Sequence, residues 1–307
     1  VGFGAYNLAS ITTTNGNTAV GYQTQQNGVG GEYNSLLGYR AGRELTSAGF
    51  NVAIGSYALD ANTTADNNTA VGAYAMTENT TGNETVAFGY NALGAHTTGN
   101  SNTAIGYQAG AAVTTGGNNE FLGRSAGATL TTGTRSTAIG SFAMGSTTAE
   151  RNVAIGYNAM LDAATTHNNV CIGWNAGANL TTFGANHNIA IGSEALTTLT
   201  DRADNIAIGY RAIGMNDAAV ISQVTAVGAL ALSATGFGGY GNVALGYRAG
   251  VAQTGGLHNT MLGRAAGVNV TSGGNNICIG YNSQTSAATV SEIVIGVNAT
   301  GKGNTTG

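Results

Sequence analysis

Asn102-Thr103-Ala104-Ile105-Gly106-Tyr107-Gln108-Ala109-Gly110 is the clearest copy of a unit that returns along the whole chain. We call the glycine that follows the aliphatic residue of each copy the anchor glycine. Most successive anchor glycines are seventeen positions apart, and the other spacings range from sixteen to nineteen. A period this constant indicates a repeat architecture. Read from the N-terminus, the anchor glycines are Gly2, Gly21, Gly38, Gly55, Gly72, Gly89, Gly106, Gly123, Gly140, Gly156, Gly173, Gly192, Gly209, Gly228, Gly246, Gly263, Gly280 and Gly296.

Each repeat is too short for a pair of helices. Seventeen residues can hold two short strands and two turns, and the apolar run before each anchor glycine is typical of a strand flanked by glycine and asparagine turns. Glycine recurs inside every apolar segment, where it would cost a helix about 1 kcal/mol relative to alanine. The sequence therefore predicts an all-β fold, a parallel β-solenoid (β-roll) of about 18 turns, one for each anchor glycine.

Stacked repeats place like side chains over like, so three structural ladders are expected. The anchor glycines should allow a bend or a close backbone approach that a Cβ atom would block. The asparagines four residues earlier should bond from layer to layer through their amides, and the aliphatic residues before the anchors should form the core. Representative members are Gly55, Gly72, Gly89, Gly106, Gly123 and Gly140, then Asn51, Asn68 and Asn102, then Ile54, Ile105 and Ile139.

An aromatic residue recurs directly after the anchor glycine, as at Tyr107 and Trp174. Where that place is small, the aromatic often moves one residue on, as in Ser56-Tyr57. The ring either switches faces there or fills the same gap from the other side. We expect these rings to serve packing rather than binding.

Both residues before the anchor are apolar, and neighbouring strand residues point to opposite faces. One of the two can pack inside its own thin coil, which leaves the other without a cover. The pattern therefore favours a rod built from several chains around an axis, most simply three.

Composition excludes several classes of function. Charged residues make up 8% of the chain and the net charge is −4, which gives no electrostatic reason to bind nucleic acid or an anionic membrane. No apolar run is long enough for a transmembrane helix.

Cys171 and Cys278 lie six turns apart, too far for a disulfide, and are interpreted as small buried hydrophobes. We expect one continuous repeat domain, 1–307, that is a fragment of a longer fibre chain.

No catalytic, cofactor or metal site is predicted. The four histidines fall on different turns, and the 14 acidic residues are scattered. The chain is therefore expected not to be an enzyme. The candidate surface contacts are the threonine pair Thr97-Thr98, one of a series in the turns, and the loop Met215–Val224, with Met215, Val220 and Ile221. A merely degenerate repeat is the alternative interpretation of that loop.

The unit Asn-x-Ala-Ile-Gly-x-x-Ala resembles the head repeats of trimeric autotransporter adhesins, and more closely the expanded version in phage tail fibres, over essentially all of the chain. The segment 97–110 carries this resemblance best, and Glu292–Gly301 is similar to the stretch before the trimerising region of such fibres. The resemblance implies a left-handed homotrimeric β-roll. The turn of this chain is longer than that of the adhesin heads, which is a departure from their pattern.

The resulting hypothesis is a structural and adhesive fibre shaft, most simply a segment of a phage tail fibre that carries or contributes to host-receptor binding. The partners would be two further copies of the chain and a host glycan or protein receptor, and the location would be extracellular, on a virion or a bacterial surface. The head of a bacterial trimeric adhesin is the alternative. An ice-binding solenoid and a polysaccharide depolymerase are further alternatives from other classes.

Overall fold

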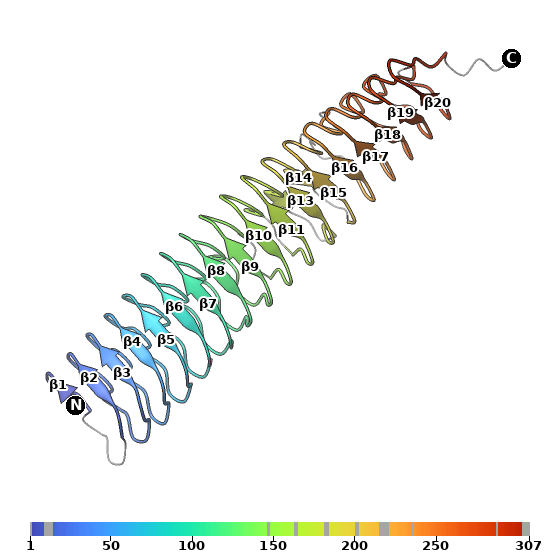
Figure 1. Cartoon of the computed structure of the whole chain (residues 1–307). Coiled ribbons are helices and arrows are strands. Elements are labelled where there is room, and N and C mark those ends of the chain that lie inside the picture. Colours follow the sequence, from blue (N-terminus) through green and yellow to red (C-terminus); the bar gives the residue numbers. More distant parts are fainter. Residues whose placement is uncertain are drawn as a thin grey trace. The chain divides into compact units, whose positions relative to one another are not determined.

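The structure is a computed structural model of the chain. It describes residues 2–8, 15–145, 148–162, 165–180, 184–199, 203–214, 221–234, 236–286 and 288–302. These residues contain strands and turns and no helix. The chain divides into two compact units, Val1–Arg151 and Asn152–Gly307, and each is described by itself. Figure 1 shows how the labelled strands of the first unit follow one another turn by turn.

The N-terminal unit is a parallel solenoid in which each turn contributes one short strand to a single sheet. Each strand pairs with the strand of the next turn, from β1–β2 through to β8–β9. The strands are β1 (Gly2–Phe3), β2 (Thr18–Val20), β3 (Ser35–Leu37), β4 (Val52–Ile54), β5 (Thr69–Val71), β6 (Val86–Phe88), β7 (Thr103–Ile105), β8 (Glu120–Leu122) and β9 (Thr137–Ile139).

The C-terminal unit has a main sheet of the same kind and a small second sheet. The main sheet runs in the order β10, β11, β13, β15, β16, β17, β18, β19 and β20, all parallel, and β12 pairs with β14. The strands are β10 (Val153–Ile155), β11 (Val170–Ile172), β12 (Asn179–Leu180), β13 (Ile189–Ile191), β14 (Thr198–Leu199), β15 (Ile206–Ile208), β16 (Thr225–Val227), β17 (Val243–Leu245), β18 (Thr260–Leu262), β19 (Ile277–Ile279) and β20 (Ile293–Ile295).

The parallel solenoid with the repeat of the sequence as its turn is confirmed, since most strands pair with the equivalent strand one repeat away. The expectation of two strands per turn is wrong outside β12 and β14, because most turns contain a single short strand. Backbone bonding between layers nevertheless continues through the turns. The amide of Tyr57 donates to Tyr39 O at 2.8 Å, and the amide of Thr63 donates to Thr80 O at 3.2 Å.

The core ladder differs from the predicted one. In β4 the middle residue, Ala53, is fully buried, whereas Ile54 is 40% exposed and Leu37 of β3 is 49% exposed. Alternate strand residues point to opposite faces, so only the middle residue of each strand enters the coil. The aliphatic residues before the anchors, including Ile54, Ile105 and Ile139, therefore lie on the outer face and do not form the core.

Side-chain sizes inside the coil compensate one another. Where the middle strand residue is alanine, the fourth residue after the anchor is often large and buried, as with Leu59 and Met76. Where the middle residue is Phe121, that place holds Gly127, and a Cβ there would lie 2.3 Å from the Phe121 ring. Gly110, at the equivalent place of the preceding turn, would meet the same ring at 2.8 Å. Where both places are small, as with Ala104 and Gly110, a large side chain of the next turn fills the gap, so the interior stays closely packed.

The anchor glycines make the close approach that the sequence predicts. Gly55 has φ +136°, and a Cβ there would lie 2.5 Å from Gly72 O in the next turn. The first anchor is Gly4 and not Gly2, because Gly2 pairs with Ala19 inside the strand. Gly4 has φ +121°, and its Cβ would meet Gly21 O at 2.2 Å. With this correction, the step from the first anchor to Gly21 equals the step from Gly21 to Gly38.

The asparagine ladder is confirmed, with the backbone as its main partner. Asn51 and Asn68 are fully buried. The Asn68 amide donates to Asn51 Oδ1 at 2.9 Å, and Asn51 Nδ2 donates to Ala65 O at 3.0 Å. Asn51 Nδ2 also lies 3.2 Å from Asn34 Oδ1. Each asparagine thereby satisfies backbone groups of its neighbouring turns that would otherwise be buried without partners.

Candidate interaction surfaces

The outward side chains of the strands form a largely apolar face on each unit, which we call the outer face. It comprises the first and third residues of each main-sheet strand. Every third residue is aliphatic apart from Phe3 and Phe88, and most first residues are Val, Ile or Thr. Phe88, Ile105 and Leu122 are 55%, 39% and 48% exposed. Such an exposed apolar series in successive turns is unusual for an isolated chain.

A column of stacked rings lies beside the outer face in the N-terminal unit. Successive ring centroids are 5.2–5.9 Å apart. Tyr57 and Tyr74, which come two residues after their anchors, join the same column as the rings that come one residue after. The sequence left open whether the displaced rings switch faces or fill the same gap, and the second alternative is confirmed. The column consists of Tyr6, Tyr22, Tyr39, Tyr57, Tyr74, Tyr90 and Tyr107.

Arginines join the aromatic side chains in both units. Arg124 lies 4.9 Å from the centroid of the Phe142 ring. In the C-terminal unit, Arg264 lies 5.7 Å from the Tyr247 ring centroid and 5.2 Å from that of Tyr281. Within the aromatic column, stacked contacts alternate with edge-to-face contacts, so each ring from Tyr22 to Tyr107 has one face against a stacked neighbour. This mutual packing leaves less open ring face on which a sugar could stack.

A shallow hollow of about 270 Å³ interrupts the outer face of the N-terminal unit. It is lined by Thr103, Ile105, Glu120, Leu122 and Ile139, with Phe121 at its base. The lining comes from three consecutive turns, and Glu120 is its one charged residue. The hollow has no convergent set of polar groups of the kind that orients a small ligand.

The threonine pair at the candidate surface has two different roles. Thr97 Oγ1 donates to Thr114 O in the next turn at 3.0 Å. The same bond recurs from Thr63, Thr80 and Thr114 to the turn that follows each. Thr98 is exposed, and its equivalents form a polar column away from the strands, which we call the threonine column. It comprises Thr64, Thr81, Thr98, Thr115 and Thr132.

The structure bears on one of the three contact residues expected in the loop Met215–Val224. Met215 and Val220 lie outside the described residues. Ile221 is fully buried, so its assignment as a surface contact is wrong. Its carbonyl oxygen lies 3.4 Å from Asn205 Nδ2, where Ala65 O stands relative to Asn51. Ile221 thus belongs to the regular repeat and supports the asparagine ladder.

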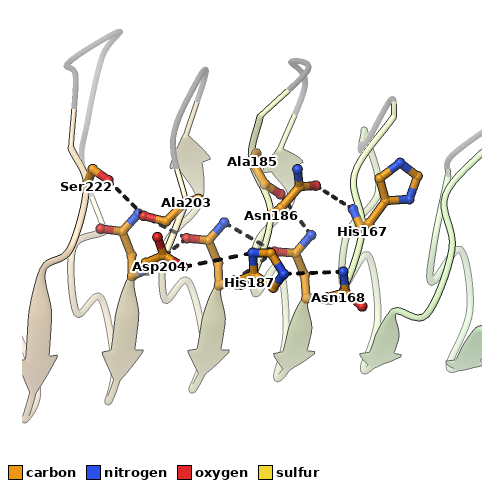
Figure 2. A network of polar contacts seen from close by, with 11 residues as sticks. His167, Asn168, Ala185, Asn186, His187, Ala203, Asp204 and Ser222 are labelled. Carbon is orange, nitrogen blue, oxygen red and sulfur yellow. Dashed lines mark hydrogen bonds and ion pairs between the residues drawn. The ribbon is translucent and has the colours of Figure 1, made fainter.

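A polar network lines one edge of the C-terminal unit (Figure 2). Asn186 Oδ1 accepts the amide of His167 at 2.7 Å, and Asn168 Nδ2 lies 3.4 Å from His187 Nε2. His187 Nδ1 lies 3.9 Å from Asp204 Oδ1, and both side chains are more than half exposed. Exposed pairs of this kind contribute little stability. No group of three or more His, Cys, Asp or Glu residues among those described is arranged to hold a metal ion.

Burial favours the neutral forms of the two cysteines and of His96. Burial raises the pKa of Cys171 to about 12 and that of Cys278 to about 11, so neither is a thiolate nucleophile near neutral pH. Burial lowers the pKa of His96 to about 4, against the opposing effect of a hydrogen bond with the Gly99 backbone. His96 Nδ1 lies 3.1 Å from Asn79 Oδ1, and Nε2 lies 3.2 Å from Asn102 Nδ2.

One cluster of ion pairs is partly buried in the N-terminal unit. Burial raises the pKa of Asp60 to about 6, and the charge of Arg40 opposes that rise. Arg43 Nε lies 3.1 Å and Arg40 Nε 3.7 Å from Asp60 Oδ1. Since both arginines already neutralise the carboxylate, the cluster has the features of a structural contact.

Comparisons with protein-family models, with curated proteins and with solved structures found no match to this chain. Among the residues that the structure describes, none belongs to a helix long and apolar enough to cross a membrane. The outer face with its aromatic column and the threonine column are the two candidate interaction surfaces of the chain.

Proposed function

We propose that the chain is a segment of a left-handed, homotrimeric extracellular fibre shaft, most simply of a phage tail fibre, whose role is mechanical and adhesive. The observation that carries the proposal is the outer face. Five tyrosines of the aromatic column are 41–48% exposed. An aromatic side chain has a surface area of about 150–250 Å², so these five side chains together expose on the order of 400 Å² of apolar surface. The aliphatic column beside them adds a similar area, and the sum exceeds the roughly 300–600 Å² of the largest patch on a typical monomer.

Three copies can cover this face without leaving an uncovered edge. When identical flat faces meet around a threefold axis, each chain contacts both of the others and the assembly closes. A two-copy sandwich of parallel chains would bury one face of each as well, and the mass in solution distinguishes it from the trimer. The proposed trimer provides stiffness through layer-to-layer backbone bonds and apolar packing, with few charges.

Adhesion would use the surfaces that the proposed trimer leaves exposed to solvent. The threonine column and the loops at the turn ends stay exposed when the outer face is covered, and hydroxyls and amides are the groups that bind glycan hydroxyls. We therefore propose a host-surface glycan or protein as the second partner. The head of a bacterial trimeric adhesin is the alternative owner of the same architecture.

The test is the mass in solution. We expect light scattering to give about three times the chain mass of 30.5 kDa. Ile105→Asp places a charge on the outer face and should reduce the mass to that of one chain, or make the protein aggregate. Thr98→Asp, an equally exposed position on the threonine column, is the matched control and should leave the mass unchanged. A monomeric wild-type chain that remains soluble would refute the proposed trimer.

Ice binding is a second candidate, favoured by one observation. Thr64, Thr81 and Thr98 expose hydroxyls at equivalent positions of successive turns, about 4.8 Å apart along the stack. A regular hydroxyl array can order water. Thermal hysteresis in the wild type that disappears in Thr81→Lys would support this function, and no hysteresis at millimolar concentration would exclude it.

A further inference from the structure

One turn of the N-terminal unit differs from all others in its charge. Glu120 is the first residue of β8, and Arg124 follows the anchor glycine at the other end of the same strand. In every other turn of this unit, the strand residues and the residue after the anchor are uncharged. The only acid and the only base of these positions thus lie in one turn, on opposite flanks of Leu122.

Neither charge has an ionic partner among the described residues. Both side chains belong to exposed residues. The Glu120 carboxylate accepts a hydrogen bond from Thr137 Oγ1 at 3.3 Å. The Arg124 guanidinium lies over the Phe142 ring. Each group is therefore held in place by a side chain of the next turn, while its charge is left unneutralised. Both groups lie beside the exposed apolar side chains of the outer face.

Threefold packing brings opposite flanks together. When three parallel chains turn the same face towards one axis, the left flank of each chain meets the right flank of the next at the same height. We infer that Glu120 of one copy pairs with Arg124 of the neighbouring copy, three times around the axis. This inference rests on the trimer proposed above and names the contact that sets how its chains are aligned.

The physical need for such a contact follows from the repeat itself. The aliphatic column is nearly the same in each turn, so a chain displaced along its neighbour by one layer would still place aliphatic residues against aliphatic residues. With that displacement Glu120 would face Tyr107 or Ser141 of the neighbour, and Arg124 would face Thr103 or Thr137. All three ion pairs would be lost. A polar pair inside an otherwise uniform apolar interface thereby selects one alignment.

Charge reversal tests the pair. Glu120→Arg and Arg124→Glu should each lower the thermal midpoint of the trimer by about 5 °C or more, because like charges then meet at three contacts. The double variant Glu120→Arg/Arg124→Glu should regain most of that loss. Thr98→Glu, a charge placed on the threonine column, is the matched control and should change the midpoint little. Failure of the double variant to recover, in a wild type that is a trimer, would overturn the inference and leave the trimer standing.

Cross-linking decides whether the pair joins two chains or lies within one. In Glu120→Cys/Arg124→Cys, a short bismaleimide should yield covalent trimers on denaturing gels. Glu120→Cys alone should yield none, since its copies face arginine positions and not one another. Cys171 and Cys278 are fully buried and should not react in the folded protein. Cross-linked single chains, or dimers from Glu120→Cys alone, would overturn the inference, whereas a wild type that is a monomer by light scattering would instead refute the proposed function.

Discussion

The two units of this chain share the main-sheet strands, the anchor glycines and the asparagine ladder, and they differ in the regularity of their turns. In the N-terminal unit the anchors keep one constant spacing from Gly4 to Gly140, and the tyrosine rings contact one another without a gap from Tyr6 to Tyr107. In the C-terminal unit the anchor spacing varies from turn to turn, a second small sheet appears, and Ser193 or Ala229 replaces the ring in some turns.

The column that survives this variation is the aliphatic one before the anchor. It runs from Val20 to Ile139 in one unit, with Phe88 as the exception, and from Ile155 to Ile295 in the other, although these side chains lie outside the coil. Insertions, by contrast, fall in the turns, where a solenoid accommodates them. The outer face therefore keeps its apolar character in both units while the turns vary, as we expect if another chain covers it.

The largest effect is expected from a side chain at an anchor, and it should be equal in both units. A Cβ at Gly106 would lie 2.3 Å from Gly123 O, and one at Gly246 would lie 2.4 Å from Gly263 O, with positive φ in both. Gly106→Ala and Gly246→Ala should each cost more than about 4 kcal/mol, because backbone atoms cannot move aside. Urea unfolding measures this cost. Gly255→Ala, with no atom closer than 3.9 Å, is the control, and unequal costs at the two anchors would break the comparison.

The next effect concerns the filling of the interior. Phe121→Ala should cost about 3–5 kcal/mol, as for other buried aromatic residues. Adding Gly127→Leu should recover a large part, because the turn then has the alanine and leucine arrangement of Ala87 and Leu93. Gly127→Leu alone should destabilise, since Phe121 occupies that space. A double variant no more stable than Phe121→Ala would contradict the compensation of side-chain sizes.

Acid should weaken the N-terminal unit through His96. Its folded pKa of about 4 lies below the ordinary value of 6.5, so the unfolded chain binds more protons between these values. The stability that depends on a neutral His96 is therefore fully present above pH 6.5. As the pH falls to 4, the free energy of unfolding decreases by about 3 kcal/mol per chain. Asp60, whose pKa is raised, acts with the opposite sign. His96→Asn, which copies Asn79 of the preceding turn, isolates the histidine.

The measurement for His96 is the difference in unfolding free energy between the wild type and His96→Asn at pH 7 and at pH 4. That difference should fall by about 3 kcal/mol on acidification. Thr98→Val, an exposed change on the threonine column that alters no titratable group, serves as the control and should show no change of this kind between the two pH values. A pH-independent difference for His96→Asn would contradict this account.

The smallest effect separates the members of a threonine pair. Thr97→Val removes a hydrogen bond to Thr114 O and should cost about 1 kcal/mol, whereas Thr98→Val should be nearly neutral. Hydrogen exchange of the amides in this turn measures both. A larger cost at Thr98 would mean that the exposed threonine column contributes to the structure.

The sequence was sufficient for the repeat, the strand before each anchor, the role of the anchor glycines and the asparagine ladder, because each depends on a residue type that recurs with one period. It did not determine which apolar residue points inward. Ala53 and Ile54 are both apolar, and only the bend at Gly55 decides that the smaller one enters the coil. The first anchor was misplaced for a similar reason, since Gly2 and Gly4 both follow a residue that can end a strand.

The conformations of the turns could not be predicted from residue types. Tyr57 and Leu59 adopt φ of 58° and 55°, a left-handed conformation that bulky side chains disfavour. They are held there by the backbone bonds to neighbouring turns, such as Leu59 N to Ala75 O at 3.0 Å. This constraint comes from stacking, and the same stacking moves Tyr57 into the aromatic column and buries Ile221.

Solvent access to the outer face in the native protein tests the central claim most directly. Ile54→Cys and Ile155→Cys place one thiol on the outer face of each unit, and Thr98→Cys places one on the threonine column. We expect a water-soluble maleimide to label Thr98→Cys rapidly and to leave both outer-face thiols unlabelled until the protein is denatured. Labelling of Ile54→Cys and Ile155→Cys as fast as Thr98→Cys in the folded protein would show that no other chain covers the outer face.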